Sequence, residues 1–205
     1  MGAGARPRRS AEQTREHALT VAGELFYRDG VRATGVDTIA ARAGIAPPTL
    51  YRLFATKDEL VAAYVERCSN AYKDRLSTAS AASAGTVRER IRDVFAVFTH
   101  DAVSETCRGC PFLLVLAEYP DPASPAHIQA VAHKTWVRAL LHDLVGELAH
   151  EAPIPDPAAL AEHLVLVAEG IYGSAQVSGG GGPAREGQRC AESLIECACG
   201  SVTGR

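Results

Sequence analysis

Residues 34–60 constrain the fold more than any other part of this 205-residue chain. Two short runs with apolar residues at helical spacing flank Gly44, and glycine takes the left-handed backbone that often ends a helix at no steric cost. The second run begins at Pro47-Pro48, and a helix tolerates proline only in its first turn. Two short helices joined by a glycine turn predict a helix-turn-helix, whose second helix enters the major groove of DNA.

The second short helix is predicted to have two distinct faces. Its apolar side chains would point inward: Leu50, Leu53 and Phe54. Its polar and basic side chains would point outward: Thr49, Tyr51 and Arg52. Thr34 is a candidate N-cap for the first short helix, and Thr56 is a candidate cap for a further helix that begins at Lys57.

Several motifs follow one another in a fixed order through this region. They are Ala22, Leu25-Phe26, Gly30, Ile39-Ala40-Ala41-Arg42-Ala43-Gly44, Leu50-Tyr51-Arg52-Leu53-Phe54, Ala55-Thr56 and Lys57-Asp58-Glu59-Leu60. This set resembles the DNA-binding headpiece of the TetR family of transcriptional regulators, over about residues 11–71. The helical patterns along the chain, with no run of clear strand alternation, predict an all-α protein of about nine helices. A three-helix helix-turn-helix headpiece would precede a C-terminal helical domain for ligand sensing and dimerisation.

We therefore expect three segments along the chain. Residues 1–10 would be a basic arm, either lying in a DNA minor groove or forming a solvated tail. Residues 11–71 would form the DNA-binding domain, and residues 72–205 the ligand-binding and dimerisation domain. The helical patterns predict that the fourth helix ends near residue 76 and that a loop covers 77–85. Further helices are expected at 86–103, 110–119, 126–150, 158–177 and 184–200, with a flexible glycine loop at 178–183.

The distribution of charge agrees with a partner that carries phosphate. The net charge is −3, but residues 1–60 hold nine Lys/Arg and seven Asp/Glu, a net +2, which leaves −5 for the rest. A mildly basic end on an acidic body suits a protein that presents one end to DNA. No apolar run approaches the roughly 18 residues of a membrane helix, and the basic N-terminus lacks the apolar stretch of a secretory signal. We expect a cytoplasmic protein with no membrane partner.

The resemblance also implies which headpiece residues contact double-stranded DNA. The candidates are Thr34, Arg42, Pro47, Thr49, Tyr51, Arg52 and Lys57. Lys57 and Tyr51 suit phosphate, as does Thr34, whereas Arg52 and Thr49 suit base edges, because Arg can form two hydrogen bonds with guanine. The sequence departs from the family pattern at Pro47-Pro48, because two prolines remove N–H donors where a more polar helix start is common.

A single short recognition helix selects too few base pairs, so modules of this kind usually bind palindromic sites as dimers. The resemblance implies that the last two helices form a homodimer interface. The candidate residues are Leu160, Leu164, Val167, Ile171, Leu194 and Ile195. The alternative is that these apolar residues fill the core of the monomer.

The middle helices supply aromatic residues for a small-molecule site. The candidates are Phe95, Phe98, Phe112, Leu116, Tyr119, His133, Trp136 and Tyr172, with His100, Glu118 and Gln176 as further polar groups. The resemblance implies that an unidentified ligand shifts the helices and changes the spacing of the two headpieces. Repression relieved by the ligand is the common case, and activation is the alternative.

Cys107-Arg108-Gly109-Cys110-Pro111 is the one motif outside the headpiece with possible chemistry of its own. Two thiols at this spacing can form a disulfide or half of a zinc site, and a helix start favours a thiolate. The alternatives are a regulator that responds to redox conditions through Cys107 and Cys110, a dithiol enzyme without a DNA function, and plain packing. We expect a regulator that is not an enzyme and that needs no metal or cofactor.

Overall fold

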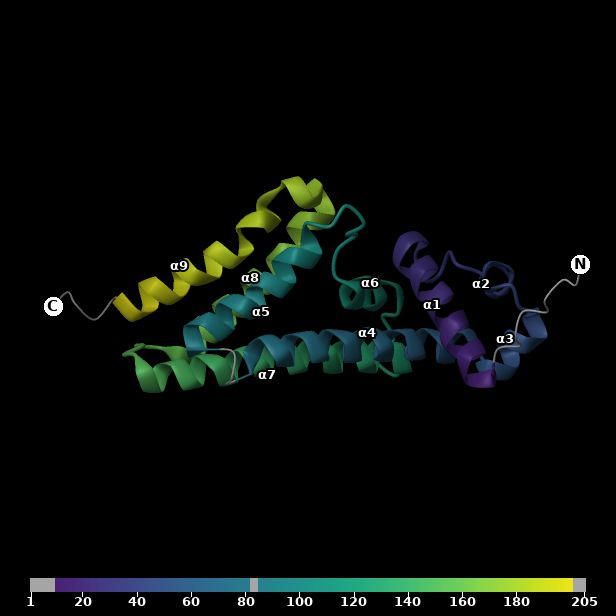
Figure 1. Cartoon of the computed structure of the whole chain (residues 1–205), viewed down its shortest axis with the longest axis horizontal. Helices are drawn as coiled ribbons and strands as arrows, with labels where there is room; N and C mark the ends of the chain where they lie inside the picture. The colour runs from purple at the N-terminus through teal and green to yellow at the C-terminus, as the bar shows by residue number, and fades with distance from the viewer. Residues whose placement is uncertain (1–9, 82–84, 201–205) are drawn as a thin grey trace, which may run out of the picture.

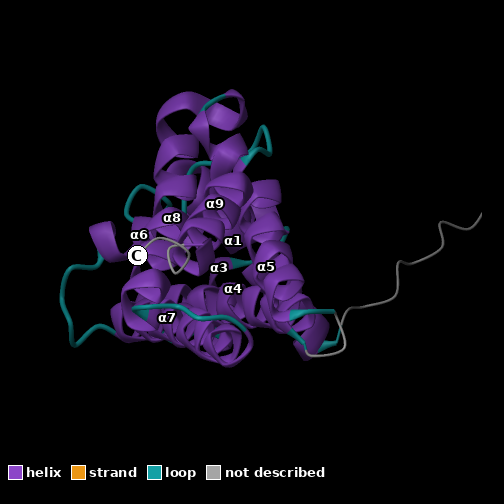
Figure 2. Ribbon diagram, turned by 90° about the vertical axis from the view of Figure 1, so that its left-hand side faces the viewer, coloured by secondary structure: helices purple, strands orange, loops and turns teal. Residues whose placement is uncertain are grey.

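The computed structural model describes residues 10–81 and 85–200. The arm predicted for residues 1–10 lies outside this part of the chain, apart from Ser10. Within the described residues the protein is built from nine α-helices and two short 3-10 turns, without a strand (Figures 1 and 2). The prediction of an all-α protein of about nine helices is confirmed.

The elements follow in this order: α1 (Ala11–Asp29), α2 (Val36–Ala43), α3 (Pro47–Leu53), α4 (Lys57–Ser80), α5 (Val87–Ala102), α6 (Pro111–Glu118), α7 (Pro125–Glu151), α8 (Pro157–Ser178), η2 (Gly179–Gly181), η3 (Pro183–Glu186) and α9 (Gly187–Gly200).

Side-chain caps fix where several of these helices begin. Ser10 and Gln13 bond each other's backbone in a capping box at the start of α1, and Thr56 accepts the N–H of Glu59 at the start of α4. The start of α4 agrees with the sequence prediction of a helix that begins at Lys57 with Thr56 as its cap. The predicted N-cap role of Thr34 is wrong, because α2 begins after Gly35 without a side-chain cap.

Parts of two predicted loops are helical instead. Helix α4 continues to Ser80, so residues 77–80 belong to the helix and the predicted end near residue 76 is wrong. In place of an open glycine loop, Gly179–Gly181 form one 3-10 turn and Pro183–Glu186 form a second. A Cβ at Gly180 would lie 2.3 Å from the carbonyl oxygen of Val103, so glycine allows this turn to pack closely against the end of α5.

The helices are arranged along one long axis (Figure 1). Helices α1, α2 and α3 pack together at the N-terminal end of α4, and we call α1–α3 the headpiece. Helix α4 extends from there beside α7, through residue 71, where the sequence predicted a domain boundary. Helices α5, α8 and α9 pack at the other end, and α6 contacts α4 and α7 between the two ends. We call helices α4–α9 the body.

A buried arginine joins three helices of the body. The Arg90 side chain on α5 donates from Nε to the carbonyl oxygen of Ser80, at the last residue of α4, over 2.7 Å. Its two terminal nitrogens bond the carboxylate of Glu147 on α7, at 2.6 and 3.2 Å. Because Arg90 is buried, these bonds replace most of the hydrogen bonds that its guanidinium would make with water, whereas the Glu147 side chain stays half exposed.

Candidate nucleic-acid interface and ligand cavity

Helix α3 presents one face to the interior and the other to solvent. Leu50 and Phe54 are buried, and Leu53 packs partly buried against the core, as predicted. On the opposite face, Tyr51 is 51% exposed and Arg52 is exposed. The outward face of α3 therefore carries a hydroxyl and a guanidinium, the two kinds of group that bond phosphates and base edges.

The turn before α3 holds that face in place. Gly44 has φ +66°, and the N–H of Ile45 donates to the carbonyl oxygen of Ala40 over 3.0 Å, which closes a Schellman motif at the end of α2. Of the other candidate residues, Arg42 and Pro47 are exposed and Thr49 is half-buried. Arg42 lies in the last turn of α2, whereas Pro47 and Thr49 lie in the first turn of α3, before Tyr51 and Arg52.

Helix α1 supports the helix-turn-helix from behind. The Nε2 atom of His17 lies 3.1 Å from the carbonyl oxygen of Ala43, at the end of α2. The guanidinium carbon of Arg15 lies 4.7 Å from the centre of the Phe54 ring, within range of a cation–π contact. Both contacts fix α2 and the end of α3 on a third helix.

Lys57 and Thr34 differ in what they can offer to phosphate. Lys57 is the first residue of α4, and its Nζ donates to the carbonyl oxygen of Arg32 over 3.4 Å. Thr34 is 4% exposed, and its hydroxyl donates to the carbonyl oxygen of Gly30 over 2.7 Å. The hydroxyl of Thr34 therefore fastens the end of α1, and the prediction that it contacts phosphate is corrected.

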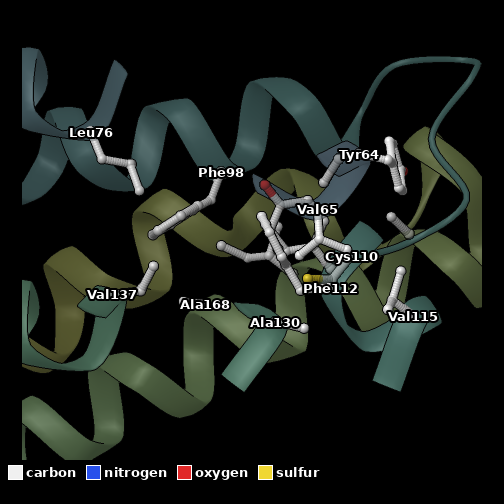
Figure 3. Packing of buried hydrophobic residues seen from close by; sticks show 14 of the residues in the cluster. Tyr64, Val65, Leu76, Phe98, Cys110, Phe112, Val115, Ala130, Val137 and Ala168 are labelled. Carbon is white, nitrogen blue, oxygen red and sulfur yellow. The ribbon is translucent and has the colours of Figure 1, made fainter. Parts of the chain in front are cut away.

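Four of the predicted ligand-binding residues line one internal cavity of the body: Phe98, Phe112, His133 and Tyr172. Tyr72, Cys110, Lys134, Val137 and Ala168 complete the lining. Figure 3 shows Cys110, Phe112, Ala130 and Val65 in the same packed cluster. The cavity volume is about 10 Å³, close to the space of one water molecule. A ligand could enter only if the surrounding side chains moved apart.

His133 is buried among these aromatic rings. Its ring stacks on Phe112 with 3.6 Å between ring centres, and its Nδ1 lies 3.1 Å from the hydroxyl oxygen of Ser69. Burial, with smaller contributions from the ammonium groups of Lys134 and Lys73, lowers the pKa of His133 to about 3. The imidazole is therefore neutral at neutral pH and offers one donor or acceptor to a ligand.

The other four predicted ligand residues lie outside the cavity lining. Phe95 is buried and packs edge-on against Phe98, with 5.7 Å between ring centres. The Trp136 ring centre lies 6.3 Å from that of His133, and Leu116 is a partly buried core residue. The hydroxyl of Tyr119 donates to Asp58 of α4 over 3.1 Å.

The sequence prediction missed two polar side chains of the cavity. Tyr72 accepts a hydrogen bond of 3.2 Å from the hydroxyl of Tyr172. Lys134 lies beside His133 on α7 and forms an ion pair with Glu169. Tyr72 could have been found from the sequence, because it lies one turn from Ser69 and Leu76 on the buried face of α4.

Helix α6 and its flanking residues contact the headpiece directly. The Glu118 carboxylate accepts the N–H groups of Val31 and Arg32, at 2.9 and 2.5 Å, in the connection between α1 and α2. Arg32 Nε in turn donates to the carbonyl oxygen of Glu118 over 2.8 Å. Glu118 was predicted as a polar group of the pocket, and it instead joins the body to the headpiece.

The predicted dimerisation residues divide into two groups. Leu160, Leu164, Ile171 and Ile195 are each at most 4% exposed and belong to the core of the monomer. Their prediction as interface residues is corrected, because the alternative of core packing applies to them. Val167 and Leu194 are partly exposed.

The outward face of α8 carries a different set of residues. Leu166 is 68% exposed and Val177 is 87% exposed, and between them Gly170 and Gly173 lie on the same face. We call Leu166, Gly170, Gly173 and Val177 the outer α8 face. A groove beside it runs between α8 and α9 and includes Val167 and Cys190.

This fold and this exposed face together define a helix-turn-helix DNA-binding module attached to a helical body. The family model for "Bacterial regulatory proteins, tetR family" matches residues 18–64. The solved TetR-family transcriptional regulator SCO4454 of Streptomyces coelicolor is 27% identical, with a TM-score of 0.80, over 93% of this chain and 96% of that chain. A solved TetR transcriptional regulator of Streptomyces avermitilis is 30% identical, with a TM-score of 0.72, over 90% of this chain and 97% of that chain.

The chain belongs to the TetR family of transcriptional regulators. It is also similar to the HTH-type transcriptional activator FasR of Mycolicibacterium smegmatis, at 41% identity over 56 residues. That match spans 27% of this chain and 26% of FasR. The protein is thus a DNA-binding transcriptional regulator of the helix-turn-helix type.

Two further observations concern the described residues only. None of their helices combines the length and the apolar character needed to cross a membrane. No set of three or more His, Cys, Asp or Glu side chains among them gathers closely enough to hold a metal ion.

Proposed function

We propose that the protein is a ligand-responsive repressor that acts in the cytoplasm and binds a palindromic operator as a homodimer. The outward face of α3 carries this proposal, because it is exposed, rigidly supported and chemically suited to DNA. Arg52 and Thr49 would read base edges, and Tyr51 and Lys57 would bond phosphates. Arg42 and Pro47 would border the same contact surface. Residues 11–71 would act as the DNA-binding domain and 72–205 as the ligand-binding and dimerisation domain.

The first prediction concerns Arg52. Selection of duplexes from a random pool, at a stated salt concentration, should yield a palindromic consensus. Arg52→Ala should weaken binding to that duplex by about 10- to 100-fold and blur the preference at the base it contacts, because a bidentate contact contributes about 1–3 kcal/mol of discrimination. Titration of labelled consensus and scrambled duplexes measures both effects.

Two variants serve as comparisons for Arg52→Ala. Lys57→Ala should weaken binding to both duplexes alike and reduce the salt dependence, because a phosphate contact carries no sequence information. Arg88→Ala removes an exposed arginine of α5 and should leave DNA binding unchanged. An equal loss on the two duplexes for Arg52→Ala would contradict its role at a base edge.

The outer α8 face supports the homodimer. Exposed Leu166 and Val177 would bury apolar surface against a second copy, and Gly170 and Gly173 would let the two backbones approach closely. A groove that includes Val167 and Cys190 adjoins this face on α9. An isologous contact of this face would set the separation of the two headpieces.

The second prediction tests this interface. A Cβ at Gly173 meets nothing within 4 Å in the monomer, so Gly173→Glu should fold normally. The buried charge at the interface should nevertheless convert dimer to monomer and weaken palindrome binding at least tenfold. Sedimentation velocity measures the oligomeric state, and Ala139→Glu, at an exposed position of α7, is the control. A Gly173→Glu protein that sediments as the wild type would rule out this interface.

The position of α6 between the aromatic cavity and the headpiece supports a response to a ligand. Phe112, on the first turn of α6, lines the aromatic cavity, and Glu118, at its end, bonds the headpiece. A ligand that needed more space than about 10 Å³ would have to move α6 or its neighbours. Such a movement would change the contacts of Glu118 with the headpiece and of Tyr119 with the start of α4, and so shift the population that fits the operator. A compound that releases the consensus duplex would identify the ligand.

A further inference from the structure

Cys107 is a thiol that small molecules in solution can reach. It is half-buried and lies in the wall of an open cleft of about 480 Å³ between α1, α4 and the end of α5. Tyr27, Tyr64 and Cys68 also line this cleft. The neighbouring aromatic cavity has Cys110 in its lining, and Tyr72 borders both the cleft and the cavity. The two cysteines of the Cys107–Cys110 motif therefore face two different spaces.

Cys110 is a buried thiol beside a cation. It is the N-cap residue of α6, and its Sγ lies 3.9 Å from Nζ of Lys134. Burial raises the pKa of the Cys110 thiol, and the Lys134 ammonium acts in the opposite direction by stabilising a thiolate. Cys110 is therefore shielded from solvent and yet placed where a negative charge on sulfur can be balanced.

The residues between the two thiols are bonded to the headpiece through Tyr27 of α1. The Tyr27 hydroxyl donates to the carbonyl oxygen of Gly109 and accepts the N–H of Arg108, each over 2.9 Å. It also lies 3.8 Å from Sγ of Cys107. Burial, opposed in part by the Arg108 hydrogen bond, raises the pKa of Tyr27 to about 12, so the hydroxyl keeps its proton at neutral pH. We call residues 107–110 with Tyr27 the thiol clamp.

The backbone of the clamp has little freedom to move without losing these bonds. Gly109 has φ +102°, a conformation that other residues rarely adopt. A Cβ at this position would also lie 3.2 Å from the side-chain oxygen of Gln176 on α8. The bonds to Tyr27 are therefore made by a backbone that is held between α1 and α8.

We propose that Cys107 and Cys110 are a modification site: a peroxide oxidises them to a disulfide, which opens the thiol clamp and weakens DNA binding. The effect on DNA rests on the proposed function, whereas the chemistry of the pair does not. Cys107 and Cys110 are three positions apart in the sequence, so a local change of backbone conformation is enough to bring their sulfurs into contact. A disulfide joins its two sulfurs at about 2.0 Å with a fixed torsion about the S–S bond, so Cys107 in the cleft and Cys110 in the aromatic cavity would have to turn toward each other, which would move residues 107–110.

The reaction balances with hydrogen peroxide as the oxidant. The Cys107 thiolate attacks one peroxide oxygen, the O–O bond breaks, and the departing hydroxide takes a proton and leaves as water. The thiolate of Cys110 then attacks the sulfenic sulfur of Cys107, the S–O bond breaks, and a second water leaves with one more proton. Two thiols lose two electrons in total, and one peroxide is reduced to two waters.

The first experiment tests the chemistry. One equivalent of hydrogen peroxide, added to the reduced full-length protein, should lower the number of titratable thiols from six to four. Peptide mapping without reduction should recover a Cys107–Cys110 link, and dithiothreitol should restore all six thiols. Cys107→Ser and Cys110→Ser should each prevent the link. Cys68→Ser, which removes the other thiol of the cleft, and Cys190→Ser, which removes an exposed thiol of α9, should leave it unchanged.

The second experiment tests the consequence on DNA. Oxidation should weaken binding to the selected duplex at least tenfold in wild type and in Cys190→Ser, and by less than twofold in Cys107→Ser. Tyr27→Phe removes the hydroxyl of the clamp, and its reduced form should already bind several-fold more weakly than reduced wild type, with a smaller further change on oxidation. Helical circular dichroism of each variant establishes that it is folded.

Three results would overturn the proposal, and each has a distinct meaning. A disulfide mapped between Cys68 and Cys107 would show that Cys107 pairs with the other thiol of the cleft and not with Cys110. A Cys107–Cys110 link that leaves DNA affinity unchanged would remove the effect on the headpiece. No loss of thiols at ten equivalents of peroxide would remove the site altogether. If the reduced protein binds no duplex at all, the proposed function fails, and thiol counting still decides whether the pair is oxidisable.

Discussion

Phe112→Ala should lower the free energy of unfolding by about 3–5 kcal/mol, a large part of the roughly 5–15 kcal/mol available to a natural domain. The ring is 2% exposed and fills the space between α6 and α7, where it stacks on His133. The variant loses the free energy gained by burying the apolar surface of the ring, and it also loses the van der Waals contacts that the ring makes with its neighbours. Urea unfolding followed by circular dichroism at neutral pH measures the change.

The next residue of the same helix provides the matched control. Leu113 is 41% exposed, so Leu113→Ala should lower the free energy of unfolding by no more than about 1 kcal/mol. Similar losses for the two variants would mean that α6 is not anchored by Phe112. The Phe112→Ala protein would also hold a larger apolar cavity than wild type, and small aromatic compounds should raise its melting temperature.

Acidification from pH 6.5 to pH 4.5 should destabilise the wild-type protein by up to about 1.4 kcal/mol per pH unit through His133 alone. The folded protein holds the pKa of His133 at about 3, whereas an unfolded chain has a histidine pKa of about 6.5. Above pH 6.5 both states leave the imidazole neutral. Below it the unfolded state binds a proton that the folded state does not, so stability falls as the pH falls toward 3.

A substitution separates this contribution from that of the carboxylates. The Glu147 carboxylate has a pKa lowered by its hydrogen bonds with Arg90, and the stability it contributes is lost only as the pH falls below about 4.5. His133→Gln should therefore flatten the slope of stability against pH between 6.5 and 4.5, and His150→Gln, an exposed site on the same helix, should not. Equal slopes for wild type and His133→Gln, measured by urea unfolding across this range, would refute the assignment.

The headpiece could be predicted from the sequence because its signals are local. Glycine at residue 44, proline at 47 and a threonine cap at 56 each act on the backbone within a few residues, and the structure places all three as expected. Thr34 was the exception, since a threonine before a helix can either cap it or bond backward. Its hydroxyl bonds backward to Gly30, a choice that depends on how α1 ends.

The body could be predicted only in outline because its contacts join distant residues. An apolar stripe on α8 does not state which neighbour it meets, so Leu160 and Leu164 could not be distinguished in advance from interface residues. What distinguishes the buried Leu160 and Leu164 from the exposed Leu166 is which side of α8 its neighbours α5, α7 and α9 cover, and that depends on the tertiary structure. For the same reason Tyr119 was assigned to the cavity, although the chain direction after α6 carries it to Asp58.

Helix α4 runs from the headpiece through the body, and its last residue, Ser80, is bonded by Arg90 of α5. It spans 24 residues, or about 36 Å at 1.5 Å per residue, from Lys57 in the headpiece region to Ser80. The bond from Arg90 holds Ser80, so a rotation of about 5° around that point would carry Lys57 through about 3 Å. That displacement is about a quarter of the roughly 12 Å width of the major groove. A rotation that changes little near Ser80 would therefore produce a much larger displacement at the end of α4 that we propose to meet DNA.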